Sequence, residues 1–73
     1  MAKQEISTDA APAPLGPYSQ AVRSGDLIFV AGQVGIDPET SEKVAGGIVE
    51  QGAQTLENVR VILEAAGATM DDV

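Results

Sequence analysis

Two stretches of the chain carry hydrophobic patterns of different period, and together they predict a small α+β fold. Over residues 48–66, apolar side chains recur every three or four positions, as on one face of a helix. They are Val49, Ala53, Leu56, Val59, Leu63 and Ala66. Gly67 follows at the position where glycine commonly ends a helix. Gly52 lies beside the stripe and would let the helix approach a sheet closely.

A β-hairpin is predicted before this helix. Its strands are residues 19–23 and 27–34, because Ser24, Gly25 and Asp26 between them form a turn signal. Both alternating sets of side chains over residues 27–31 are apolar, which indicates a strand that is covered on both faces. The helix can cover one face, and a partner subunit would have to cover the other. Phe29 is expected in the core.

The remaining segments predict less regular structure. Residues 3–6 form a short edge strand, and residues 8–17 form an extended connector, since they hold three of the four prolines. Residues 37–40 predict a loop, which lacks the ligand spacing and glycine of a calcium site. Residues 68–72 are a predicted connector, and Val73 would begin a strand that completes a right-handed βαβ unit.

Composition narrows the class of protein. The 73 residues make one domain at most, and the small, aromatic-poor core favours association. Cysteine and histidine are absent, which excludes a disulfide framework, thiolate catalysis and a histidine base. The net charge is −7 and the four basic residues are scattered, so no nucleic-acid partner is expected. The sequence shows no signal peptide and no long apolar run, so we expect a cytoplasmic protein with no membrane association.

The candidate chemistry lies in two short motifs. Gly16-Pro17-Tyr18-Ser19-Gln20 places an aromatic hydroxyl in a turn just before the first hairpin strand. Phe29-Val30-Ala31-Gly32-Gln33 places a glycine with an open backbone at the end of the second. A strand glycine alone more often marks a bulge or a close-packing point. Together the motifs predict a small polar-ligand site built without histidine, cysteine or metal.

These motifs, the Asp37-Pro38-Glu39 turn and the segments 63–67 and 71–73 match one family in order and spacing. From about residue 10 to 73, the chain closely resembles the N-terminal part of the reactive intermediate (enamine/imine) deaminase A family, also called RidA, YjgF or L-PSP. The resemblance implies a chorismate-mutase-like α+β fold and a homotrimer with ligand sites between subunits. It also implies cofactor-free hydrolysis of enamines and imines, such as 2-aminoacrylate, to 2-keto acids and ammonia.

The resemblance also assigns roles to residues. Tyr18 matches the catalytic tyrosine, whose hydroxyl would bond the substrate or position water. Gly32 matches the substrate-binding glycine, whose N–H meets the ligand, and Ala31 stands where many members carry serine. The family's carboxylate-binding arginine and water-positioning glutamate lie in its C-terminal part, and neither Arg23 nor Arg60 matches that arginine. Residues 1–73 are therefore expected to form a single incomplete domain that is inactive alone.

Two other functions stay open at this point. A non-catalytic short form could act as an oligomerising interaction module that pairs through exposed sheet edges. An endoribonuclease or translation inhibitor of the L-PSP type is the weaker alternative, because the acidic charge balance gives RNA binding no support.

Overall fold

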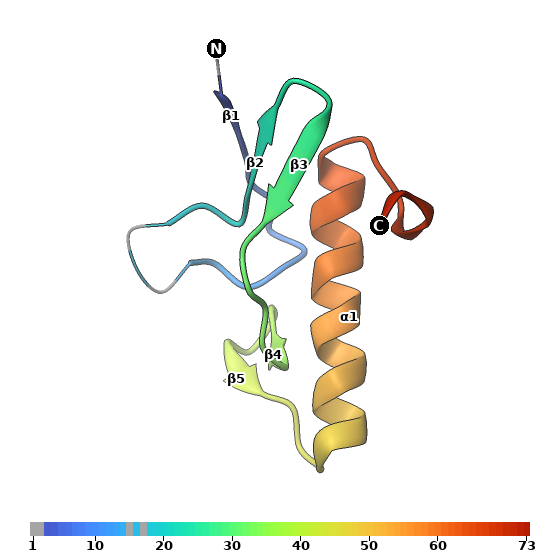
Figure 1. The fold of residues 1–73 in the computed structure, drawn as a ribbon. Helices are drawn as coiled ribbons and strands as arrows, with labels where there is room; N and C mark the ends of the chain where they lie inside the picture. Colours follow the sequence, from blue (N-terminus) through green and yellow to red (C-terminus); the bar gives the residue numbers. More distant parts are fainter. Residues whose placement is uncertain (1–2, 15, 17) are drawn as a thin grey trace.

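A three-stranded antiparallel sheet forms the N-terminal half of the computed structural model, which describes residues 3–14, 16 and 18–73. Its order is β1 (Lys3–Ile6), β2 (Ala21–Ser24) and β3 (Leu27–Val30) (Figure 1). The predicted edge strand and hairpin are confirmed, although β3 ends four residues early. Of the predicted connector 8–17, Leu15 and Pro17 lie outside the described residues.

The β2–β3 turn has the geometry that its sequence favours. Ser24 pairs with Leu27, which leaves Gly25 and Asp26 as the two loop residues. Gly25 has a φ of 60°. A positive φ at the first loop position is what a type II′ hairpin turn requires, and glycine adopts it without steric cost.

The loop predicted at residues 37–40 lies in the turn of a second, very small hairpin, whose strands were not predicted. Strand β4 (Ile36–Asp37) pairs with β5 (Glu42–Lys43). The turn between them is held by Asp37, whose carbonyl accepts from the Ser41 N–H at 2.8 Å. The Asp37 carboxylate also accepts from the Glu39 N–H at 2.8 Å. Strands of two residues are too short to show an alternating pattern, so periodicity does not predict them.

Helix α1 (Ile48–Ala65) confirms the predicted helix to within one residue. Gly67 follows its C-cap with a φ of 83°. The Gly67 N–H donates to the Glu64 carbonyl at 3.0 Å and the Ala68 N–H to the Leu63 carbonyl at 2.9 Å. These two bonds form a Schellman motif, which satisfies carbonyls that the helix end leaves free.

The helix does not bury the face that its apolar stripe predicts. Leu63 and Ala66 are buried, but Val49 is 77% and Leu56 59% exposed. The prediction is wrong for the first half of α1. The side of the helix that faces residues 34–36 instead carries Gln51, which packs against Gly35, and Asn58, which donates to the Val34 and Ile36 carbonyls. An apolar side chain could not satisfy those backbone carbonyls.

Gly35, and not Gly52, is the glycine at the close approach between helix and strand. A Cβ atom on Gly35 would lie 2.7 Å from the Gln51 carbonyl oxygen and 2.8 Å from the Gln51 Cα. A Cβ on Gly52 would meet nothing within 4 Å. The role expected of Gly52 is therefore wrong, and Gly35 lets α1 pack against the chain just before β4.

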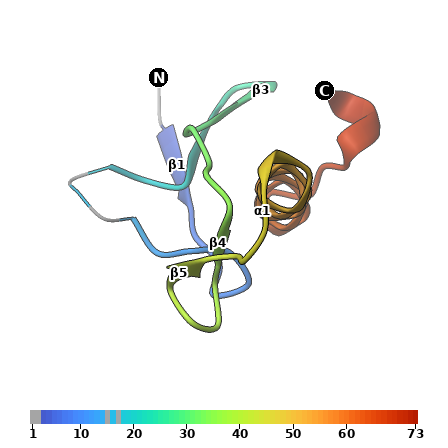
Figure 2. The same ribbon diagram turned by 90° about the horizontal axis from the view of Figure 1, so that it is seen from below.

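The core lies between one face of the sheet and the C-terminal half of α1 (Figure 2). Its buried cluster consists of Ile6, Ala11, Ala21, Ile62 and Ala66. Along β3, Ile28 and Val30 pack against this cluster, whereas Leu27 and Phe29 are 62% and 60% exposed. Phe29 is thus not a core residue of this chain, contrary to expectation, because it lies on the sheet face that α1 does not cover.

The chain ends in a single 3₁₀ turn, η1 (Met70–Asp72), in place of the predicted irregular connector. The Thr69 hydroxyl accepts from the Asp71 N–H at 3.2 Å and caps this turn. Val73 follows as its C-cap and belongs to no strand within the described chain, where a strand was expected to begin. No helix in the described ranges is long and apolar enough to cross a membrane.

Candidate functional site

Tyr18 and Gly32, 14 positions apart in sequence, line one small cavity of about 40 Å³. Its wall consists of Pro12, Ala13, Tyr18, Gln20, Gly32, Gln33, Val34 and Ile36. Ala31 is not in the wall, but its N–H donates to the Gln20 carbonyl at 2.9 Å beside it. A water molecule occupies about 30 Å³ in the liquid, so the cavity can hold little more than water. By itself it is too small to enclose a substrate.

Tyr18 lies at the surface, where its ring can meet a ligand. The Tyr18 N–H donates to the Gly16 carbonyl at 2.8 Å. The ring packs over Gly16, and 51% of the residue remains exposed. A tyrosine whose only role was core packing would be more deeply buried.

The backbone of Gly32 is open to its surroundings in the described structure. A Cβ atom there would meet no heavy atom within 4 Å. Its φ also lies outside the left-handed region, unlike that of Gly25, Gly46 and Gly67. Within the described residues, neither close packing nor a positive φ requires glycine at this position, and its backbone is open.

Gln20 holds the proline-containing loop in place beside the cavity by hydrogen bonds to residues 8–12. Its side chain is 3% exposed, and its Oε1 accepts from the Thr8 N–H at 2.7 Å. Its Nε2 donates to the carbonyls of Thr8, Ala11 and Pro12 at 3.1, 3.3 and 2.8 Å. The sequence pattern did not reveal this role, although Gln20 closes the motif that contains Tyr18.

Asn58, on α1, forms hydrogen bonds to a second segment of the cavity wall, residues 34–36. It is fully buried, and its Nδ2 donates to the carbonyls of Val34 at 3.1 Å and Ile36 at 3.0 Å. Its Oδ1 accepts from Gln54 Nε2 at 2.8 Å, so the whole carboxamide is paired. Asn58 does not belong to the apolar stripe of the predicted helix, so the stripe gives no sign of this role.

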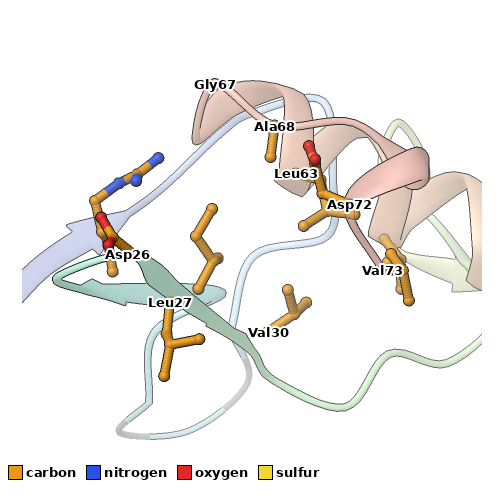
Figure 3. A pocket seen from close by; sticks show the side chains of 11 residues that line it. Asp26, Leu27, Val30, Leu63, Gly67, Ala68, Asp72 and Val73 are labelled. Carbon is orange, nitrogen blue, oxygen red and sulfur yellow. The ribbon is translucent and has the colours of Figure 1, made fainter.

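A larger cavity of about 600 Å³ lies between the β2–β3 hairpin and the C-terminal end of α1 (Figure 3). Leu27 and Val30 line it from β3, and Leu63 and Val73 line it from the opposite side. Tyr18 and Gly32 are not among its lining residues. Apolar side chains make up much of its wall, and Arg23, Asp26 and Asp72 also line it.

Neither arginine of the chain lines the Tyr18–Gly32 cavity. The Arg23 guanidinium donates to the carbonyl of Ala66 at the end of α1. Arg60 pairs with Glu57 and Glu64 on the exposed side of the helix. Hydrogen bonds and charge attraction from Arg60 lower the pKa of Glu57, and the two glutamates raise the pKa of Arg60. The described cavity wall therefore supplies no cation for a carboxylate.

A metal centre is not evident either. Within residues 3–14, 16 and 18–73, no three or more acidic side chains gather as a candidate ligand set. At the Tyr18–Gly32 cavity, the chain can offer a ligand the phenol of Tyr18, the backbone N–H of Gly32 and the backbone carbonyls around them.

Comparison with known proteins places the chain in a family. Residues 8–73 match the family model described as Endoribonuclease L-PSP. The chain is 58% identical over 73 residues to a RutC family protein of Pyrococcus abyssi, covering all of this chain and 58% of that protein. It is 48% identical over 71 residues to the 2-iminobutanoate/2-iminopropanoate deaminase of Mus musculus, covering 97% of this chain and 53% of that one.

A solved structure agrees with these matches. The crystal structure of RidA from the Antarctic bacterium Psychrobacter sp. PAMC 21119 superposes with a TM-score of 0.89 at 47% identity. The match covers 93% of this chain and 55% of that chain. The chain thus belongs to the L-PSP family, and the predicted α+β fold of this family is confirmed. It spans about half the length of the relatives that it matches.

Proposed function

We propose that the whole protein to which this chain belongs hydrolyses imines of the 2-iminobutanoate and 2-iminopropanoate type to 2-keto acids and ammonia. The supporting observation is that Tyr18 and Gly32 line one cavity in a chain that is 48% identical to the mouse deaminase. The proposed site needs no cofactor, and residues 1–73 supply one wall of it.

The reaction assigns simple tasks to this wall. Water adds to the C=N carbon, the nitrogen takes up protons and leaves as ammonia, and the remaining oxygen becomes the ketone. The Tyr18 hydroxyl would bond the substrate or the attacking water, and the Gly32 N–H would donate to the ligand. Ala31 would contribute backbone groups only, since its methyl group cannot replace a serine hydroxyl.

Two groups for this chemistry have to come from elsewhere in the whole protein. The substrate carries a carboxylate, which is best held by a bidentate arginine. The described wall of the cavity contains no charged side chain, and Arg23 and Arg60 bond other groups. We therefore place the arginine and the proton-transferring carboxylate in the part of the family's length that residues 1–73 do not span, and expect 1–73 to be inactive alone.

The uncovered sheet face supports assembly as part of the same proposal. Leu27 and Phe29 on β3 expose large apolar side chains to solvent. Covering them by neighbouring subunits in a homotrimer would remove this surface from water and close the shallow cavity into an intersubunit site. We expect such a protein in the cytoplasm. A purely non-catalytic interaction module would use the same face, without turnover.

Ammonia release from imine generated in situ tests the proposal, after subtraction of spontaneous hydrolysis. The whole protein should accelerate the reaction, residues 1–73 should not, and Tyr18→Phe should lower kcat/KM about 10–100-fold. An inactive whole protein would refute the deaminase. Cleavage of a labelled RNA at moderate salt would favour the ribonuclease alternative, and a stable trimer without either activity would favour the interaction module.

A further inference from the structure

Two buried carboxamides support the Tyr18–Gly32 cavity: Gln20 is part of its wall, and Asn58 bonds the carbonyls of two other wall residues from α1. Gln20 and Asn58 are the buried polar residues of the described chain. We propose that both are positioning residues, which fix the backbone that presents Tyr18 and Gly32 to the substrate. The identity of that substrate rests on the proposed function, but the geometry does not.

Gln20 holds the first segment through backbone as well as side-chain bonds. Its carboxamide bonds backbone groups of Thr8, Ala11 and Pro12, and Pro12 is itself part of the cavity wall. Its own carbonyl accepts from the Ala31 N–H, one residue before Gly32. Gln20, two residues after Tyr18 in the sequence, therefore connects the proline-containing loop to the chain at the end of β3.

Asn58 holds the second segment on both sides of Gly35. Its Nδ2 bonds the Val34 and Ile36 carbonyls, and both residues line the cavity. The Ile36 N–H also donates to the Val34 carbonyl at 2.8 Å, which makes a tight turn at Gly35. Gly35 is buried against the backbone of Gln51, so this turn has little room to shift.

Such bracing matters because a backbone donor works only in the correct position. Binding groups must be held within about 0.5 Å of the productive geometry, and a displacement of 1 Å can cost 100-fold in rate. Val34 and Ile36 lie two and four residues after Gly32, and no described atom lies within 4 Å of a Cβ position at Gly32 itself. The position of the Gly32 N–H therefore depends on the anchored residues on either side.

Variants of the whole protein test the proposal through kinetics and NMR. Asn58→Leu and Gln20→Leu keep the approximate size of each side chain but remove its donors. Each should lower kcat/KM for the imine about 10–100-fold and shift the Gly32 amide resonance. The matched control is Gln54→Leu, which removes the bond to Asn58 Oδ1 but leaves both Asn58 donors on the cavity segment. It should change kcat/KM less than twofold.

A folded Asn58→Leu protein with wild-type kinetics and an unmoved Gly32 resonance would overturn the proposal. Where the variants fail to fold, backbone order parameters of the wild-type protein decide. Values for residues 31–36 as high as those of α1, near 0.85, support a braced segment, and lower values overturn it. If the wild-type protein hydrolyses no imine, the proposed function fails, while the resonance shifts and order parameters still test the positioning.

Discussion

The Arg23 guanidinium, on the middle strand of the sheet, donates a hydrogen bond to the carbonyl of Ala66 at the C-cap of α1. These residues are 43 positions apart, so the bond joins the hairpin to the end of the helix. The last carbonyls of a helix have no partner within it and carry partial negative charge. A cation placed there satisfies a carbonyl and interacts favourably with the helix dipole.

Replacing Arg23 by Gln should therefore lower the free energy of unfolding by about 1–2 kcal/mol. Urea denaturation of the whole protein measures this. The control is Arg60→Gln, because Arg60 forms only exposed ion pairs, which contribute little. Equal effects of the two substitutions would contradict the role assigned to Arg23.

The two glycines in and after α1 should respond to alanine with opposite signs. Gly67→Ala forces a Cβ into a φ of 83° and should cost about 1–2 kcal/mol. Gly52→Ala places a methyl group where nothing lies within 4 Å and should stabilise the helix by about 0.5–1 kcal/mol. Thermal denaturation distinguishes the cases. A stabilising Gly67→Ala would show that the Schellman end is not required.

Gly35→Ala should destabilise the fold by about 1–3 kcal/mol, because its Cβ would overlap the backbone of Gln51. Gly32→Ala should change the free energy of unfolding by less than about 0.5 kcal/mol, since open space surrounds that position. The comparison by urea denaturation tests whether crowding separates the two glycines. Equal costs would mean that Gly32 also has a packing role.

Removing the guanidinium of Arg60 should raise the pKa of Glu57 toward its ordinary value. Hydrogen bonding and then charge attraction from Arg60 hold that pKa down in the folded chain. Since the folded pKa is depressed, the stabilisation is present above the unfolded pKa, and is lost as pH falls below about 4.5. NMR titration of the Glu57 carboxyl carbon in wild type and Arg60→Gln measures this. An unchanged titration would contradict the pairing.

The sequence predicted those parts of the fold in which local pattern and packing agree. The hairpin follows from the Gly25 turn between apolar runs, and the end of α1 follows from Gly67. The helix face was misread where α1 meets backbone carbonyls, since Asn58 replaces the apolar contact that periodicity assumes. Gln20 and Asn58 were missed for the same reason, because a buried amide that bonds distant backbone leaves no periodic signal.

The candidate site could be predicted from the sequence only in part. Tyr18 and Gly32 stood out through motif resemblance, and the structure places both on one cavity. The small size of their cavity and the absence of charged side chains from its described wall are determined by the tertiary structure. That absence depends on where Arg23 and Arg60 find partners, which residue spacing alone does not determine.

The most direct test of the account is the imine hydrolysis rate of the whole protein with Gly32→Val, compared with wild type and with Gly52→Ala. The valine side chain would project from the one open backbone position beside Tyr18. We predict that Gly32→Val lowers kcat/KM at least tenfold at unchanged oligomeric state, while Gly52→Ala keeps the wild-type rate. A folded Gly32→Val protein that hydrolyses the imine as fast as wild type would contradict the assignment of the Tyr18–Gly32 cavity as the substrate site.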